Sequence, residues 1–414
     1  MKKIKPMLLA AAVIILTALL GHFRIIPQIA QQHFSNGIAQ QQTGEHQQAI
    51  LAFTKAIDLR EKCPQFYLQR GISLATLGQQ EMAIADYNRA ANLGLQSPQL
   101  LLHRAIAMRQ QGKINEALTD LDAAIAQCDS CAQAYYQRGL THATLGNFQE
   151  AIADYNKSIA LDTTNASALA NRAQSLAALN DFKGAIADYD RIMTNSQPTP
   201  EQHRQRGWFK FQIGDYAGAI TDLEQALPKF NTDTELLQML GSANSNLNQH
   251  AAALSAYDAA LQLEPKSAKL HSERGGVLLR LGRLSDAQTA FSSAIALNAQ
   301  YSNAFFGRGL AKALADDQQA AIPDFDRAIA LDATMAAAYF NRGVAHAALS
   351  NHAKAIADYN HTLRLDPQNA AAYYARGLAH IALSNHADGC TDLKKALQLG
   401  YPDAAQMLTI YCQN

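Results

Sequence analysis

The stretch Gln137-Arg138-Gly139-Leu140 decides the fold, because the same phrase returns along the chain at one fixed spacing. Every spacing is 34 residues or a multiple of 34. A chain of 414 residues normally suggests several globular domains, but an internal repeat overrides that estimate. Related phrases occur at Gln69-Arg70-Gly71, Gln205-Arg206-Gly207, Glu273-Arg274-Gly275, Gly307-Arg308-Gly309, Asn341-Arg342-Gly343 and Ala375-Arg376-Gly377.

Working outward from this phrase, each repeat holds a small residue at position 8, a second small residue at position 20 and a large apolar residue at position 24. In the fourth repeat these are Gly139, Ala151 and Tyr155. The pattern predicts two helices joined by a short turn, with the small residues letting the helices approach closely and the large residue filling the space between neighbours. The repeats begin at residues 30, 64, 98, 132, 166, 200, 234, 268, 302, 336 and 370.

This period and positional pattern resemble the tetratricopeptide-repeat family, over about nine-tenths of the chain. The resemblance implies an all-α, right-handed solenoid superhelix of eleven repeats from residue 30 to residue 403. Residues 404–414 would form a C-terminal capping helix. The chain departs from the family in three ways: the terminal proline occurs only as Pro265 and Pro367, position 7 is mostly arginine, and Pro323 lies near the start of a second helix.

The arginines at position 7 allow two interpretations. Position 23 carries an aspartate wherever position 7 carries an arginine, except in the eighth repeat, where Arg274 faces Ala290. This matched presence predicts a row of partly buried Arg–Asp pairs between the two helices of each repeat, and Arg138 with Asp154 is an example. The competing interpretation is a row of arginines that binds an anionic ligand.

Composition argues against several other classes of function. Lysine and arginine number 35, as do aspartate and glutamate, so the basic excess typical of a nucleic-acid binder is missing. Walker, zincin, GxSxG and dinucleotide motifs are missing from the sequence. The histidines recur at packing positions, as His142, His346 and His380 do at position 11. We therefore expect a non-enzymatic chain without a metal or a small-molecule cofactor.

The N-terminus resembles a targeting segment. Lys2, Lys3 and Lys5 precede an apolar run from residue 7 to residue 20, which is the order of a secretory signal. Residues 1–29 are therefore expected to be a signal or membrane anchor. An uncleaved anchor would place the repeats outside the inner membrane, in the periplasm of a Gram-negative cell. A cleaved signal that leaves a soluble periplasmic protein is the alternative.

The five cysteines suit an exported chain. Cys128 and Cys131 form a lone CxxC between two repeats, where a local disulfide or two idle thiols are both expected in place of a redox centre. Cys390 lies on the last second helix and Cys412 in the closing helix, so we predict a disulfide between them.

The family resemblance implies that positions 2, 5, 6, 9, 12 and 13 of the first helices line a concave groove. Amides recur there and can bond an extended peptide backbone without demanding charge. The first repeats lack the groove lysines that clamp chaperone tails in related proteins. The amide positions that we select are Gln69, Gln137, Asn171, Gln205 and Asn341.

The sixth repeat differs from the others. It holds the only tryptophan, Trp208, at position 9, with Phe211 one turn later and Arg204 beside them. Tryptophan and arginine dominate interface hot spots, so these residues are candidates for partner binding, although Trp208 is equally expected to pack between repeats. The last repeats carry aromatics at position 5, which makes that half more apolar; these are Phe306, Phe340 and Tyr374.

Three functions remain open on this sequence. The first is a non-catalytic scaffold or adaptor that holds a protein or an extended peptide. The second is an assembly factor for an envelope polysaccharide or a secretion complex. The third is a solenoid that binds glycan directly through aromatic and amide side chains.

Overall fold

The computed structural model describes residues 25–412, and this part of the chain is helical throughout, without strands. Of the signal or anchor expected over residues 1–29, residues 1–24 lie outside the described range. None of the helices described is long and apolar enough to cross a membrane. A helix over residues 25–42 runs through residue 30, where the first repeat was expected to begin.

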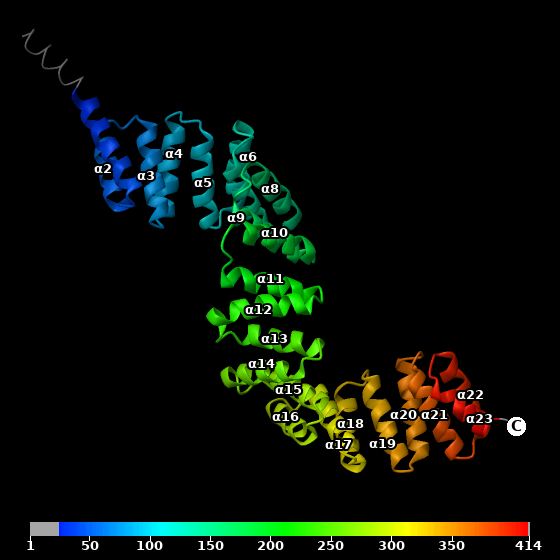
Figure 1. Cartoon of the computed structure of the whole chain (residues 1–414). Helices are drawn as coiled ribbons and strands as arrows, with labels where there is room; N and C mark the ends of the chain where they lie inside the picture. Colours follow the sequence, from blue (N-terminus) through cyan, green and yellow to red (C-terminus); the bar gives the residue numbers. More distant parts are fainter. Residues whose placement is uncertain (1–24, 413–414) are drawn as a thin grey trace, which may run out of the picture. The chain divides into compact units, whose positions relative to one another are not determined.

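The chain divides into two compact units, which meet at Gln197 and Pro198. In each unit consecutive helices pack side by side as antiparallel pairs (Figure 1). The all-α helical-repeat solenoid expected from the sequence is confirmed. After residues 25–42, the N-terminal unit contains α2 (His46–Leu59), α3 (Pro64–Thr76), α4 (Gln80–Asn92), α5 (Pro98–Gln110), α6 (Ile114–Gln127), α7 (Ala132–Thr144), α8 (Phe148–Leu161), α9 (Ala166–Ala178) and α10 (Phe182–Asn195).

The C-terminal unit continues the same alternation and ends on one shorter helix. From the second repeat onward, each first helix begins at the residue where the 34-residue period places a repeat start. The helices are α11 (Pro200–Gln212), α12 (Tyr216–Phe230), α13 (Thr234–Asn246), α14 (His250–Leu263), α15 (Ala268–Arg280), α16 (Leu284–Leu297), α17 (Ser302–Leu314), α18 (Gln318–Leu331), α19 (Ala336–Ala348), α20 (His352–Leu365), α21 (Ala370–Ala382), α22 (His386–Gln398) and α23 (Asp403–Tyr411).

The turn inside each repeat depends on a left-handed residue at position 15. Glycine takes this conformation without strain, as at Gly78 with φ 76°. Other repeats place a short polar residue there, as at Asn180 with φ 63° and Ser350 with φ 60°. The short turn expected from the sequence thus has the same backbone geometry in all eleven repeats.

Close contact between the small residue at position 8 and the ring at position 24 forms the core of each repeat. A Cβ added at Gly71 would lie 2.6 Å from Cε1 of Tyr87, which is fully buried. A ring can also touch the next repeat: Phe291 meets its own Gly275 and also Gly307 of the following helix pair. The predicted roles of the small and large positions are thus confirmed.

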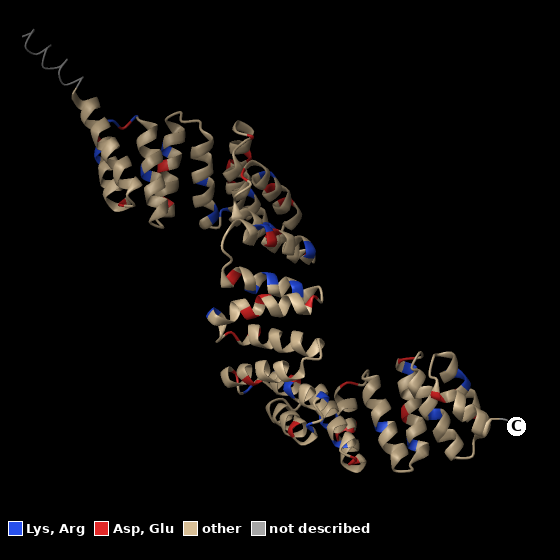
Figure 2. Ribbon diagram, in the orientation of Figure 1, with Lys and Arg blue, Asp and Glu red and all other residues tan. Residues whose placement is uncertain are grey.

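The predicted Arg–Asp pairs are present. Arg138 donates from Nε and Nη2 to the two carboxylate oxygens of Asp154, at 2.9 and 2.7 Å. Acidic and basic residues are interspersed among the helices of both units (Figure 2). The same two-point contact links Arg70 to Asp86, Arg104 to Asp120, Arg172 to Asp188, Arg206 to Asp222, Arg308 to Asp324, Arg342 to Asp358 and Arg376 to Asp392.

The exception in the eighth repeat has a physical explanation. Arg274, which faces Ala290 in its own repeat, turns to Asp258 of the preceding repeat at 2.6 Å. Several arginines that pair within their own repeat also contact position 25 of the preceding repeat, which is the position of Asp258. Arg138, for example, donates to Asp122 at 2.6 Å. Each such arginine therefore joins two successive second helices, a link between repeats that the sequence pattern had not indicated.

Both cysteine pairs are disulfide-bonded. Cys128 and Cys131 close the connection between α6 and α7. Cys390 on α22 joins Cys412 at the end of α23, which confirms the predicted bond. Cys63 is a free thiol.

Candidate functional site

A pocket of about 260 Å³ opens on the first helices of the sixth, seventh and eighth repeats, all within the C-terminal unit. Its walls come from α11, α13 and α15, and every lining residue occupies position 2, 5, 6, 9, 12 or 13. We call it the Trp208 pocket. Its lining consists of Trp208, Phe211, Gln212, Glu235, Gln238, Met239, Ser242, Lys269 and Glu273.

Neighbouring aromatic rings pack against Trp208 and Phe211. The Trp208 ring lies 5.3 Å from Phe209, which is fully buried, in an edge-on arrangement. The Phe211 ring makes a similar contact with Tyr216 at 5.6 Å. Trp208 and Phe211 are both half-buried and both line the pocket. Each side chain therefore packs against its neighbours and is also exposed to the pocket.

Glu273 gives the pocket an acidic wall. It accepts a hydrogen bond from Nε2 of Gln238 at 3.1 Å, and the Nζ atom of Lys269 lies 4.0 Å away. Its buried Oε2 atom has no well-formed hydrogen bond, and the Tyr257 hydroxyl acts on the same carboxylate as a neutral donor. Burial raises the pKa of Glu273 above its ordinary value, against the opposing effects of Lys269, Gln238 and Tyr257.

Arg204 is already occupied by side chains of the chain itself. Its Nε atom donates to Asp233 at 2.9 Å, its Nη2 atom lies 3.4 Å from Glu235, and its guanidinium lies 5.5 Å from the centre of the Phe230 ring. It is not part of the pocket lining. The sequence grouped Arg204 with Trp208 and Phe211, but in the structure it ties α11 to the start of α13.

The amides selected from the sequence are only partly available. Gln137 is 8% exposed, and its Oε1 accepts a hydrogen bond from Arg109 at 3.0 Å. Asn171 donates to the Ser167 carbonyl of its own helix at 2.8 Å, and Asn341 donates to Ala337 in the same way at 2.8 Å. Gln69 and Gln205 are half-buried. These amides lie in different repeats and are not brought into one pocket.

The late aromatics are half-buried and pack inward. Phe306 lies 6.1 Å from the Phe325 ring, and Phe340 lies 5.9 Å from Tyr359. Tyr374 lies 4.6 Å from Tyr401, next to the closing helix. Their rings therefore contribute to the core of their own repeats and present only an edge to the surface.

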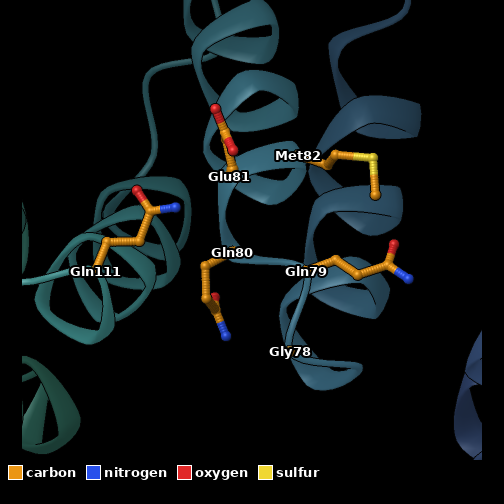
Figure 3. A pocket seen from close by; sticks show the side chains of 6 residues that line it. All are labelled: Gly78, Gln79, Gln80, Glu81, Met82 and Gln111. Atoms are coloured by element: carbon orange, nitrogen blue, oxygen red, sulfur yellow. The ribbon is translucent and has the colours of Figure 1, made fainter.

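Another pocket, of about 450 Å³, lies at the turn between α3 and α4 and at the end of α5 (Figure 3). Its lining is mostly polar and contains no aromatic ring. It lies at a turn, away from the groove positions of the first helices. The lining residues are Gly78, Gln79, Gln80, Glu81, Met82 and Gln111.

Sequence reasoning missed the acidic part of the Trp208 pocket. Glu273 occupies position 6, where the earlier repeats carry mostly amides. Glu235 occupies position 2, which is glutamine in the first four repeats and Ser167 and Glu201 in the next two. The signal was thus the loss of the amide pattern in the later repeats. Lys269 and Met239 have no comparable signal.

Comparison with known proteins identifies the repeat. Sequence models described as "Tetratricopeptide repeat" match residues 132–165 and 336–369, and also 34–98, 238–302 and 273–336. A further "TPR repeat" model matches residues 107–146. These matches together cover more than half of the chain, which belongs to the tetratricopeptide-repeat family. It is accordingly a helical scaffold for protein–protein interaction.

The chain is also similar to several solved structures. A crystal structure of the APC/C hetero-tetramer Cut9-Hcn1 matches at 14% identity and a TM-score of 0.48, over 91% of this chain and 95% of that chain. The C-terminal part of a TPR repeat-containing protein from Cytophaga hutchinsonii matches at 18% identity and a TM-score of 0.49, over 58% and 98%. A crystal structure of MamA matches at 27% identity and a TM-score of 0.37, over 40% and 97%. No curated protein sequence matches the chain significantly.

Proposed function

We propose that this scaffold binds a protein or an extended peptide segment on the first helices of the sixth to eighth repeats, with the Trp208 pocket as its main contact. The observation that carries this proposal is the pocket itself. It gathers the only tryptophan of the chain, a phenylalanine and two carboxylates from three successive repeats. Half-buried aromatic anchors in a pocket are typical of interface hot spots.

The proposed location is the periplasmic side of a bacterial inner membrane, with the chain anchored by its N-terminal segment. The three early lysines and the apolar run after them support export. The two disulfides are also in keeping with an oxidising compartment. A cleaved signal, which would leave the repeats soluble in the same compartment, remains the alternative proposal.

Two further functions fit parts of the same surface. As an assembly factor for an envelope polysaccharide or a secretion complex, the chain would use the Trp208 pocket to hold an enzyme of that complex. As a glycan-binding solenoid, it would stack a sugar ring on Trp208 or Phe211 and hold its hydroxyls with Gln212 and Gln238. The aromatic and amide lining of the pocket favours the glycan-binding function.

The test is an affinity purification of the full chain from native membranes, with wild type, Trp208→Ala and Val344→Ala compared. Val344 occupies position 9 of the tenth repeat, the same register as Trp208, and its side chain is 40% exposed. We expect Trp208→Ala to lose a specific protein partner that Val344→Ala retains. Recovery of the same partners by all three chains would contradict the proposal, and recovery of polysaccharide without protein would favour the glycan-binding alternative.

A further inference from the structure

The Trp208 pocket holds more acidic than basic groups. Glu235 and Glu273 line it together with one basic residue, Lys269, and Glu235 already faces the Arg204 guanidinium at 3.4 Å. The side chain of Lys269 is 62% exposed, and its ammonium comes no closer to Glu273 than 4.0 Å. A distant and solvated lysine compensates a half-buried carboxylate only in part. Inside the cavity, the negative charge on Glu273 is therefore the dominant one.

The hydrogen bonds of Glu273 also leave its negative charge only partly compensated. Gln238 and the Tyr257 hydroxyl supply neutral donors, and the buried Oε2 atom has no well-formed hydrogen bond. A carboxylate that is withdrawn from water normally gains several donors or a close cation. A positively charged group placed in the pocket would supply the compensation that the chain itself does not provide.

The aromatic part of the lining suits the same kind of group. Trp208 and Phe211 border the cavity that Glu273 also lines. The face of an aromatic ring attracts cations, and the indole ring does so most strongly. The chain uses this interaction elsewhere, since the Arg204 guanidinium lies 5.5 Å from the centre of the Phe230 ring.

The size of the pocket limits what can enter. Its volume of about 260 Å³ is below the range of roughly 300–1,000 Å³ that holds drug-sized ligands. A single long side chain fits a space of this size, whereas a helix or a sugar chain could only pass across its mouth. The occupant is therefore best described as one residue of a longer segment.

We propose that the Trp208 pocket recognises the cationic side chain of an arginine or lysine in the bound protein segment. The aliphatic part of that side chain would lie against Trp208 and Phe211, and its charged end would face Glu273, with Glu235 at the rim. This inference rests on the proposed function, because it names the residue type that the groove selects.

The only tryptophan of the chain reports directly on this pocket, so its fluorescence follows binding without a label. The probes are two acetylated, amidated Gly-Ser peptides with one central arginine or one central citrulline, the neutral isostere of arginine. The arginine peptide should change the fluorescence of the full chain saturably. The citrulline peptide should bind at least about tenfold more weakly.

Two matched variants locate the selectivity. Glu273→Gln should remove the preference for arginine over citrulline. Glu224→Gln, which makes the same charge change at an exposed site on α12, should retain it. Thermal unfolding by circular dichroism verifies that both variants are folded. Equal binding of the two peptides, an unaltered preference in Glu273→Gln, or an unchanged fluorescence with both peptides would overturn the proposal.

The outcome separates this inference from the proposed function. If arginine selectivity is missing while Trp208→Ala still loses the native partner, the groove binds a segment but does not select a cation. If Trp208→Ala retains every partner as well, the binding surface itself is wrongly placed.

Discussion

At the scale of single residues, the Arg–Asp pairs show how a repeat uses charge inside a helical stack. The Asp154 side chain is 7% exposed and that of Arg138 is 23% exposed, and two hydrogen bonds join them. These bonds raise the pKa of Arg138, so the guanidinium remains charged at any physiological pH. Because Arg138 also reaches Asp122 of the preceding repeat, it fixes the position of three helices.

The strength of this pairing can be measured by a double-mutant cycle. Arg138→Ala or Asp154→Ala should each lower the free energy of unfolding by about 3–5 kcal/mol, because each leaves a partly buried charge without its partner. The double variant should cost about 1–3 kcal/mol less than the sum of the two. Urea unfolding followed by circular dichroism provides the measurement, and additive losses would refute the pairing.

Asp258 supplies the comparison for this cycle. Its side chain is 45% exposed where it meets Arg274. An ion pair in water contributes less, so Asp258→Ala should cost only about 0.2–1 kcal/mol. An equal loss at Asp258 and Asp154 would show that burial does not set the strength of these pairs.

Glu273 should make the protein less stable at neutral pH. A carboxyl whose pKa is raised by folding carries no cost when it is protonated in both states, and its full cost appears above the folded pKa. Glu273→Gln should therefore raise the melting temperature at pH 7, and the gain should shrink as the pH falls through the folded pKa. A gain that is the same at every pH would contradict this account. The exposed Glu224→Gln variant serves as control.

At the scale of the helix pair, the distance between the two helices is set by what stands at position 8. A glycine there lets the ring at position 24 lie directly on the backbone of the first helix, as Tyr87 does on Gly71. The ring is then completely withdrawn from water. In the fifth repeat, which has Ala173 at position 8, Tyr189 keeps 6% of its surface exposed.

Two alanine substitutions separate packing from helix propensity. Gly71→Ala would place a Cβ 2.6 Å from Tyr87, and we expect a loss of about 1–3 kcal/mol from overpacking. Gly276→Ala also adds a methyl group to a first helix, but no atom lies within 4 Å of the new Cβ. It should stabilise the chain by about 0.5–1 kcal/mol. Chemical denaturation of both variants gives the comparison, and losses of equal size would contradict it.

At the scale of the whole molecule, helix α23 covers the apolar face of the eleventh repeat, since Ala404 packs with Leu393 and Ala396 of α22. The disulfide between Cys390 and Cys412 fixes the far end of α23 to the same helix. Terminal caps of this kind keep the apolar face of a solenoid out of water.

Breaking this disulfide should loosen the C-terminal end of the array first. A bond between residues 22 apart limits the unfolded chain and contributes about 3 kcal/mol. Cys412→Ser should therefore speed amide hydrogen exchange in α23 and α22 while helices α11 to α14 stay protected. Cys131→Ser, which opens a bond between residues only 3 apart, should have a smaller effect. Unchanged exchange in α23 would show that packing alone holds the cap.

Most of the fold was predictable because it depends on relations within one repeat. Gly71 and Tyr87, or Arg138 and Asp154, stand at a constant separation, and the period makes each relation visible many times over. The partner of Arg274 was not predictable in this way, since it required comparing a residue with the preceding repeat. The amides were overvalued because the sequence does not show that Asn341 bonds to its own helix.

The sequence by itself determined the helix pairs, the starts of the second to eleventh repeats, the residues that hold each repeat together and the disulfide at the C-terminal end. These follow from local spacing, which fixes the face of a helix on which each side chain lies. Only the tertiary structure decided where the candidate site lies. Gln238 and Glu273 are 35 residues apart and meet because successive first helices stack side by side, which brings the Trp208 pocket together from three repeats.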